Sequence, residues 1–212
     1  MATPLPEPFR DVWRVAGTRT SQRKLGFVSS TAETTLFEHG PTADAAPAIG
    51  RAADDRLPAR SLFAVELVLS PSLPSIGIAP AAVLEMAAPR AKRQFLETVA
   101  SAGLVVEDER EATRFERADG TTGKRYVLET ASRTDTDRAS ADAIAAETHV
   151  AVWPTDEAYG MAGGTLPLED GDLDTLDADL EIAPGRERKR VYEFVRTVDP
   201  GSGCESPVDR DG

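Results

Sequence analysis

Asparagine is absent from the sequence, cysteine occurs once, and histidine occurs twice. Cys204 is alone, so it cannot form an internal disulfide, and no neighbouring residue is a base that would activate its thiol. The histidines, His39 and His149, lie in no HxH, HxxE or HExxH pattern, although catalytic and zinc sites often use histidine. We therefore expect no catalytic residue and no metal ligand, and we lean against an enzyme.

Long apolar runs are also missing. No stretch approaches the ~20 residues that span a bilayer. Residues 1–10 are polar and rich in proline, with no apolar signal core and no lipobox cysteine. From these absences we expect a cytoplasmic protein without a membrane partner.

Phosphate-binding and hydrolase motifs are absent too, since the chain contains no GxGxxG, GxxxxGK[ST] or GxSxG pattern. Residues 120–124 (GTTGK) superficially match a phosphate cradle. They lie between two expected strands rather than between a strand and a helix, so we interpret them as a hairpin turn. We expect no cofactor.

Negative charge is in excess, with 36 Asp and Glu against 24 Lys and Arg and a net charge of -12. Only four of the basic residues are lysine. This composition resembles cytoplasmic proteins of salt-in haloarchaea, whose carboxylates hold water in molar salt while screening removes self-repulsion. We expect a halophilic protein. The alternative is a mildly acidic mesophilic protein from a GC-rich genome.

The same acidity argues against a nucleic-acid partner, because binding to the phosphate backbone needs a basic surface. The one basic cluster in the chain spans residues 186–190 (RERKR), where Glu187 dilutes the positive charge. We interpret this cluster as the solvated face of a helix.

Residues 61–132 organise the chain as strand, turn, helix, strand, hairpin turn and strand. Residues 61–69 (SLFAVELVL) are the most apolar run, and Glu66 is the single charge on the second face of this strand. Residues 104–116 and 124–130 flank a glycine-containing turn, which predicts a hairpin.

Two helices are expected. The spacing of Phe95, Val99 and Ala102 predicts a helix over about 89–102, with Pro89 at its first position. A C-terminal helix over about 186–198 is predicted by apolar residues at intervals of three and four. These residues are Val191, Phe194, Val195 and Val198.

The remaining elements are shorter. Residues 12–18 form a plausible strand, with a helix as the alternative, and residues 25–39 form one long strand or a hairpin. A weak helix is expected near 139–146. Residues 148–153 (THVAVW) and 158–163 (AYGMAG) are expected to form a pair of strands.

Together these elements predict an α+β fold, an antiparallel sheet with the helices at about 89–102 and 186–198 packed on it. An N-terminal arm (1–24) is expected to be partly disordered, with a possible strand. Residues 25–198 form a single domain with flexible acidic insertions at about 40–60 and 133–146. The tail (199–212) is expected to be disordered.

An acidic loop offers the one metal-binding hypothesis. Asp170, Asp172, Asp174 and Glu181 occupy positions 1, 3, 5 and 12 of a calcium-loop pattern over residues 170–181. However, Thr175 stands at position 6, where the sharp turn requires glycine. We therefore interpret the loop as solvated, with a weak calcium site as the alternative.

The order of elements resembles that of small uncharacterised haloarchaeal proteins whose architecture is similar to the PsbP-like α+β fold. The resemblance spans about residues 25–198 and rests on these segments: SLFAVELVLSP, FLETVASAG, VVEDEREATRFERADGTTGKRYVLET, AVWPTDEAYGMAGGTLP and RVYEFVRTV. It implies a mostly non-enzymatic protein that acts in assembly or binding, at photosystems or on a small GTPase. No catalytic motif is shared, so it implies no site residue.

Three functions stay open. The first is a non-catalytic binding or scaffold module with a protein partner, contacted by the concave side of the sheet or by the 120–123 turn. The second is a carboxylate-based enzyme or small-ligand binder, with His39 or His149 near a cleft lined by acids. The third is a calcium-responsive module. The oligomeric state is not indicated by the sequence.

Overall fold

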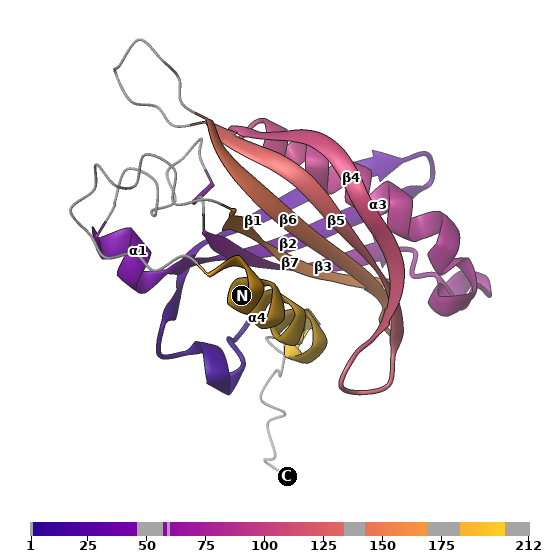
Figure 1. Ribbon diagram of the computed structural model, residues 1–212. Coiled ribbons are helices and arrows are strands. Elements are labelled where there is room, and N and C mark those ends of the chain that lie inside the picture. Colours follow the sequence, from indigo (N-terminus) through magenta and orange to yellow (C-terminus); the bar gives the residue numbers. More distant parts are fainter. Residues whose placement is uncertain (1, 46–56, 59, 134–142, 169–182, 202–212) are drawn as a thin grey trace.

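The computed structural model of the protein describes residues 2–45, 57–58, 60–133, 143–168 and 183–201. Seven strands form one antiparallel sheet in the order β1-β2-β3-β7-β6-β5-β4 (Figure 1). The strands are β1 (Trp13–Leu25), β2 (Val28–His39), β3 (Ser61–Ser70), β4 (Leu104–Glu116), β5 (Thr122–Arg133), β6 (Ala143–Pro154) and β7 (Tyr159–Pro167). The expected α+β class with an antiparallel sheet is confirmed.

Helices of two kinds accompany the sheet. The α-helices are α1 (Gly40–Ala45), α3 (Leu84–Ala100) and α4 (Pro184–Thr197). Single turns of 3-10 helix are η1 (Glu7–Phe9), η2 (Pro74–Ile76) and η3 (Pro80–Val83).

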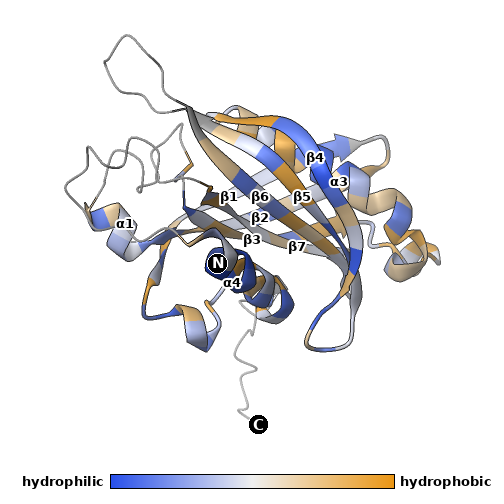
Figure 2. Ribbon diagram, viewed as in Figure 1, coloured by the Kyte–Doolittle hydropathy of each residue, from blue (hydrophilic) through white to orange (hydrophobic). Residues whose placement is uncertain are grey.

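Alternation along the strands divides the core into two layers, one on each face of the sheet. On β6, Ala151 and Trp153 join the cluster that contains Phe194 of α4. Val150 and Val152 point to the opposite face and join the cluster against which α3 packs. Figure 1 shows α4 in front of the sheet and α3 on its other side, and Figure 2 shows the alternation of polar and apolar residues along the strands.

Strand β7 lies at the centre of the sheet, and all nine of its residues are buried. Its small side chains allow the neighbouring backbones to approach closely. A Cβ atom on Gly163 would lie 1.8 Å from the carbonyl oxygen of His149 on β6. Glycine is therefore required at this position by contact with β6.

The N-terminal part of the chain joins the sheet through β1. β1 pairs with β2 along almost its whole length, and the turn between them contains Gly26 at φ 67°. Of the two alternatives left open for residues 25–39, the long strand is the one observed: residues 28–39 are the single strand β2, and its hairpin partner is β1. The side chain of Phe9 is buried against Phe194, with ring centroids 5.4 Å apart.

Helix α3 begins five residues earlier than the sequence predicts. Pro89 lies inside the helix instead of at its start. Proline removes one backbone hydrogen bond but leaves the apolar stripe intact, and packing of Ala88 and Val99, both buried, holds the helix together. Gly103, at φ 82°, leads from the end of the helix into β4.

Two other predictions are wrong. The weak helix near 139–146 is contradicted over residues 143–146, which form the start of β6 and pair with residues 130–133 of β5. Residues 139–142 lie outside the described part of the chain. Residues 40–45, interpreted as part of a linker, form α1, in which Thr42 and Ala43 are buried. Alanine and threonine are compatible with a loop or a helix, so contact with the sheet decides that residues 40–45 form a helix.

Candidate functional site

Helix α4 directs two adjacent charged residues, Glu187 and Arg188, toward different strands. The apolar residues of this helix, Val191, Phe194 and Val195, pack on the sheet and bring the first turn of the helix close to it. Glu187 is buried, and Arg188 reaches across to Glu147, a buried residue on β6. Two ionic clusters therefore lie between α4 and the sheet.

The first is the Arg60 cluster, formed by Arg60, Glu187, Arg190, Thr42 and His39. Arg60 Nη2 donates a hydrogen bond of 2.6 Å to Glu187 Oε1, and both side chains are almost completely buried. Arg190 Nη1 donates to the same oxygen over 3.2 Å, and Arg60 Nη1 donates to Thr42 Oγ1 over 3.4 Å. The charges thus compensate one another, which a buried ion requires.

His39 is a neutral member of this cluster. The backbone N–H of Thr42 donates to His39 Nδ1 over 3.3 Å, and Thr42 Oγ1 lies 2.8 Å from the same nitrogen. Burial, together with the positive charges of Arg60 and Arg190, lowers the pKa of His39 to about 3. A histidine with this pKa is a poor general base at neutral pH, and its position at the end of β2 fits a structural role.

The second is the Glu147 cluster, formed by Glu147, His149, Arg188 and Arg110. Glu147 and His149 are two residues apart on β6, so both side chains lie on the α4 face of the sheet. His149 Nε2 lies 2.6 Å from Glu147 Oε1. Arg188 donates to both carboxylate oxygens, over 2.8 and 3.0 Å, and Arg110 Nη1 lies 3.7 Å from Oε2.

These contacts keep Glu147 ionised. Burial alone would raise the pKa of this carboxyl, but the hydrogen bonds and charges of His149 and Arg188 outweigh burial and lower the pKa to about 2. A carboxylate of such low basicity, already bound by a guanidinium through both oxygens, is poorly suited to accept a proton from a substrate.

His149 retains one atom with an unmet hydrogen-bonding requirement. Its Nδ1 is buried and has no hydrogen-bond partner among the described residues. The sequence hypothesis required a histidine beside carboxylates. The structure places His149 next to Glu147, whereas the hydrogen-bond partner it gives His39 is Thr42.

The outer surface of α4 carries an exposed aromatic side chain in contact with two guanidinium groups. The Tyr192 ring centroid lies 5.4 Å from Cζ of Arg125 on β5 and 5.8 Å from Cζ of Arg196 on the next turn of α4. These distances are those of cation–π contacts. Tyr192 is 36% exposed, the largest exposure of any described tyrosine or tryptophan. We call Tyr192, Arg125 and Arg196 the Tyr192 surface.

The turn between β4 and β5 clamps the end of α4. Arg117 is buried and donates to the carbonyl oxygens of Val195 and Val198, over 2.9 Å each. Its guanidinium also lies 4.2 Å from the Trp153 ring and 3.2 Å from Asp119 Oδ2. The turn at 120–123 is therefore structural, which agrees with its interpretation as a hairpin rather than a phosphate cradle.

The family of the chain follows from comparison with known proteins. Residues 14–199 match the model of a domain of unknown function, DUF6517. The chain belongs to this family. The match begins in β1 and ends just after α4, so the DUF6517 domain contains the whole sheet and both ionic clusters. No curated protein matches the chain.

Other candidate residues from the sequence are not placed. The acidic loop at 170–181 and Cys204 lie outside the described residues of this DUF6517 protein. Within the described ranges, no group of three or more His, Cys, Asp or Glu side chains could hold a metal ion. In the same ranges, no helix combines the length and apolar character needed to cross a membrane.

Proposed function

We propose that this DUF6517 protein is a non-catalytic binding or scaffold module that binds a protein partner through the Tyr192 surface. The observation that carries this proposal is an exposed tyrosine on the outer face of α4 that contacts two arginines, one on β5 and one on α4. Tyrosine and arginine are the residue types most enriched among those that dominate binding energy in protein interfaces.

The support beneath this surface favours binding. Helix α4 is attached to the sheet by the Arg60–Glu187 pair, by Arg188 on Glu147, and by Arg117 on its last carbonyl groups. A contact surface that is already ordered loses little conformational entropy when a partner binds. Tyr192 therefore has the character of a preorganised anchor.

Affinity recovery of the tagged protein from its own lysate in molar KCl, followed by mass spectrometry, tests the proposal. We expect a stoichiometric protein partner with the wild type and about a 30-fold loss of affinity for it with Tyr192→Ala. The matched control is Phe27→Ala, which removes an exposed aromatic from the β1–β2 turn. Recovery of the wild type alone, or equal capture by Tyr192→Ala, would contradict the proposal.

A small-ligand site is the second candidate function, and it rests on the unpaired Nδ1 of His149 beside Glu147. An acceptor or donor at that nitrogen would remove the cost of burying an unmet polar atom. Nitrogen NMR of the two histidines, recorded with and without a metabolite extract, tests this candidate. A change confined to His149 is expected if a ligand binds there.

The cellular setting is also part of the proposal. We propose a halophilic protein of haloarchaeal type in the cytoplasm, with the PsbP-like arrangement of a sheet that carries α3 and α4. The negative net charge of -12 supports the halophilic assignment. A melting temperature that rises strongly between low and molar KCl is expected.

Calorimetry with calcium in molar KCl tests the 170–181 loop as a weak cation site.

A further inference from the structure

Positive charge is unevenly distributed along this acidic chain. Residues 12–32 contain four basic residues and no acidic one, and residues 67–96 contain three basic residues and one acidic one. The two segments together carry a net charge of +6, so the other 161 residues carry -18. Such asymmetry is typical of proteins that bind an anionic surface.

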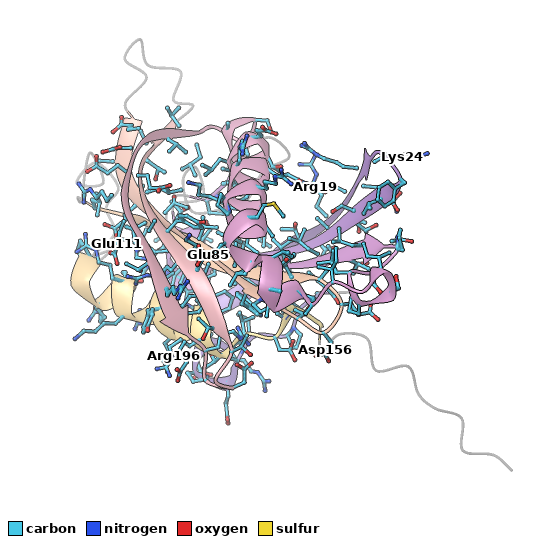
Figure 3. The ribbon with its side chains drawn as sticks, turned by 90° about the vertical axis from the view of Figure 1, so that its right-hand side faces the viewer. Arg19, Lys24, Glu85, Glu111, Asp156 and Arg196 are labelled. Atoms are coloured by element: carbon cyan, nitrogen blue, oxygen red, sulfur yellow. The ribbon has the colours of Figure 1, made fainter. Side chains whose placement is uncertain are left out.

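The structure brings cations from both segments to one side. On β1, Arg19 pairs in register with Thr34, next to Ala32 of the cluster under α3, so Arg19 lies on the α3 face. An ion pair of 3.5 Å between Arg23 and Glu97 joins the β1–β2 hairpin to α3. Figure 3 shows α3 with this hairpin beside it, and Arg19 and Lys24 on the hairpin.

Helix α3 contributes an exposed stripe. Met86, Arg90 and Arg93 are separated by four and three residues, so they project from the same side of the helix, and all three are exposed. No ion pair is formed among the described residues by Arg19, Arg90 or Arg93, whereas Glu85 and Glu97 are both engaged by basic partners. The cations on this side are therefore available.

Apolar side chains accompany these cations. Phe27, in the β1–β2 turn, is 83% exposed, more than any other large apolar residue of the described chain, and Met86 is 56% exposed. Ile76 and Ile78, just before α3, are also exposed. We call Arg19, Phe27, Met86, Arg90 and Arg93 the basic-apolar face.

We propose that the basic-apolar face docks on an anionic membrane surface, with Phe27 entering the interface and Arg19, Arg90 and Arg93 contacting lipid headgroups. Basic residues mixed with exposed apolar ones are the pattern of interfacial membrane binding. Single-stranded nucleic acid requires several aromatic rings for stacking, and this face offers only Phe27.

This inference does not depend on the proposed protein partner, because the Tyr192 surface lies on the opposite face of the sheet. It also differs from the sequence expectation of no membrane partner. That expectation rested on the absence of a spanning segment, and docking on a surface needs none.

Vesicle flotation tests the proposal. The full chain is mixed with vesicles of equal parts phosphatidylglycerol and phosphatidylcholine, or of phosphatidylcholine alone, at the lowest KCl that preserves its circular dichroism spectrum. We expect flotation with the anionic vesicles only. Arg90→Glu should weaken binding at least about fivefold and Phe27→Ser about tenfold. Lys189→Glu, an equal charge change on exposed α4, should leave binding unchanged.

Insertion of residue 27 is tested separately with brominated lipid. Trp13 and Trp153 are buried, so the wild type should show little quenching of tryptophan emission. Phe27→Trp should be quenched by brominated anionic vesicles, and Tyr192→Trp on the opposite face should not. The proposal is overturned by failure of the wild type to float, by equal losses in Arg90→Glu and Lys189→Glu, or by binding to a single-stranded oligonucleotide without binding to vesicles.

Discussion

Replacement of Glu147 by glutamine should destabilise the protein in a way that depends on pH. Glutamine preserves the size of the side chain but removes the charge that Arg188 and His149 contact. A carboxyl whose pKa falls from 4.5 to about 2 gains about 3 kcal/mol of folded-state stability when it is ionised. We therefore expect Glu147→Gln to lower the free energy of unfolding by about 3 kcal/mol at neutral pH.

The sign of the pH dependence follows from the lowered pKa. The stabilisation by Glu147 is fully present above about pH 4.5, the pKa of the unfolded chain, and it is lost as the pH falls toward 2. The difference between the wild type and Glu147→Gln should therefore shrink over this range, even though protonation of other carboxylates destabilises both proteins.

Urea unfolding in molar KCl, followed by tryptophan fluorescence at several pH values, measures this difference. Glu193→Gln on the exposed side of α4 makes the same change in charge and should alter stability by no more than about 0.5 kcal/mol. A difference for Glu147→Gln that is equal at pH 7 and pH 3 would refute the reasoning. A loss no larger than that of the control would do the same.

Three further measurements test other parts of the structure. The ring signals of His39 should not titrate by NMR above about pH 4, because its pKa is about 3, and neutral burial should make stability fall as the pH drops below about 6.5. Gly163→Ala should cost more than about 4 kcal/mol in urea unfolding, since its Cβ would collide with a β6 carbonyl oxygen, whereas Gly17→Ala meets no atom within 4 Å and should be tolerated. Arg60→Leu should cost about 3–5 kcal/mol, because it removes the buried partner of Glu187 and leaves only the more exposed Arg190 to compensate the charge, and adding Glu187→Leu should restore much of the loss in the same measurement.

The sequence predicted the sheet well where side chains follow the strand period. The hairpin of β4 and β5 and the pairing of β6 with β7 both follow from apolar runs on either side of a turn. Helix boundaries were predicted less accurately. Proline is common at the first position of a helix, so Pro89 indicated a start there, but packing against the sheet decides where α3 begins. Residues 143–146 were assigned to a helix because alanine and isoleucine are compatible with a helix as well as with a strand that pairs with β5.

The ionic clusters were missed, although one of them left a signal. Glu187 lies four residues before Val191 on the apolar stripe of α4, and a charged residue on such a stripe must have a buried partner. Its partner Arg60 is 127 positions away, so pairing depends on the strand order and could not be found from spacing. Glu147 and His149 also share one face of an apolar strand, which indicates an inward-facing pair but not that Arg188 closes over it.

The two clusters together explain why α4 presents Tyr192 in one direction. Residues 187 and 188 project about 100° apart around a helix. Glu187 is fixed to Arg60 beside β3, and Arg188 is fixed to Glu147 on β6. An apolar stripe alone would tolerate a small rotation or slide of the helix, but either motion would break both ionic contacts and leave buried charges unpaired. The buried charges therefore set the orientation of the helix, and through it the position of the exposed ring that we propose as the contact with a partner.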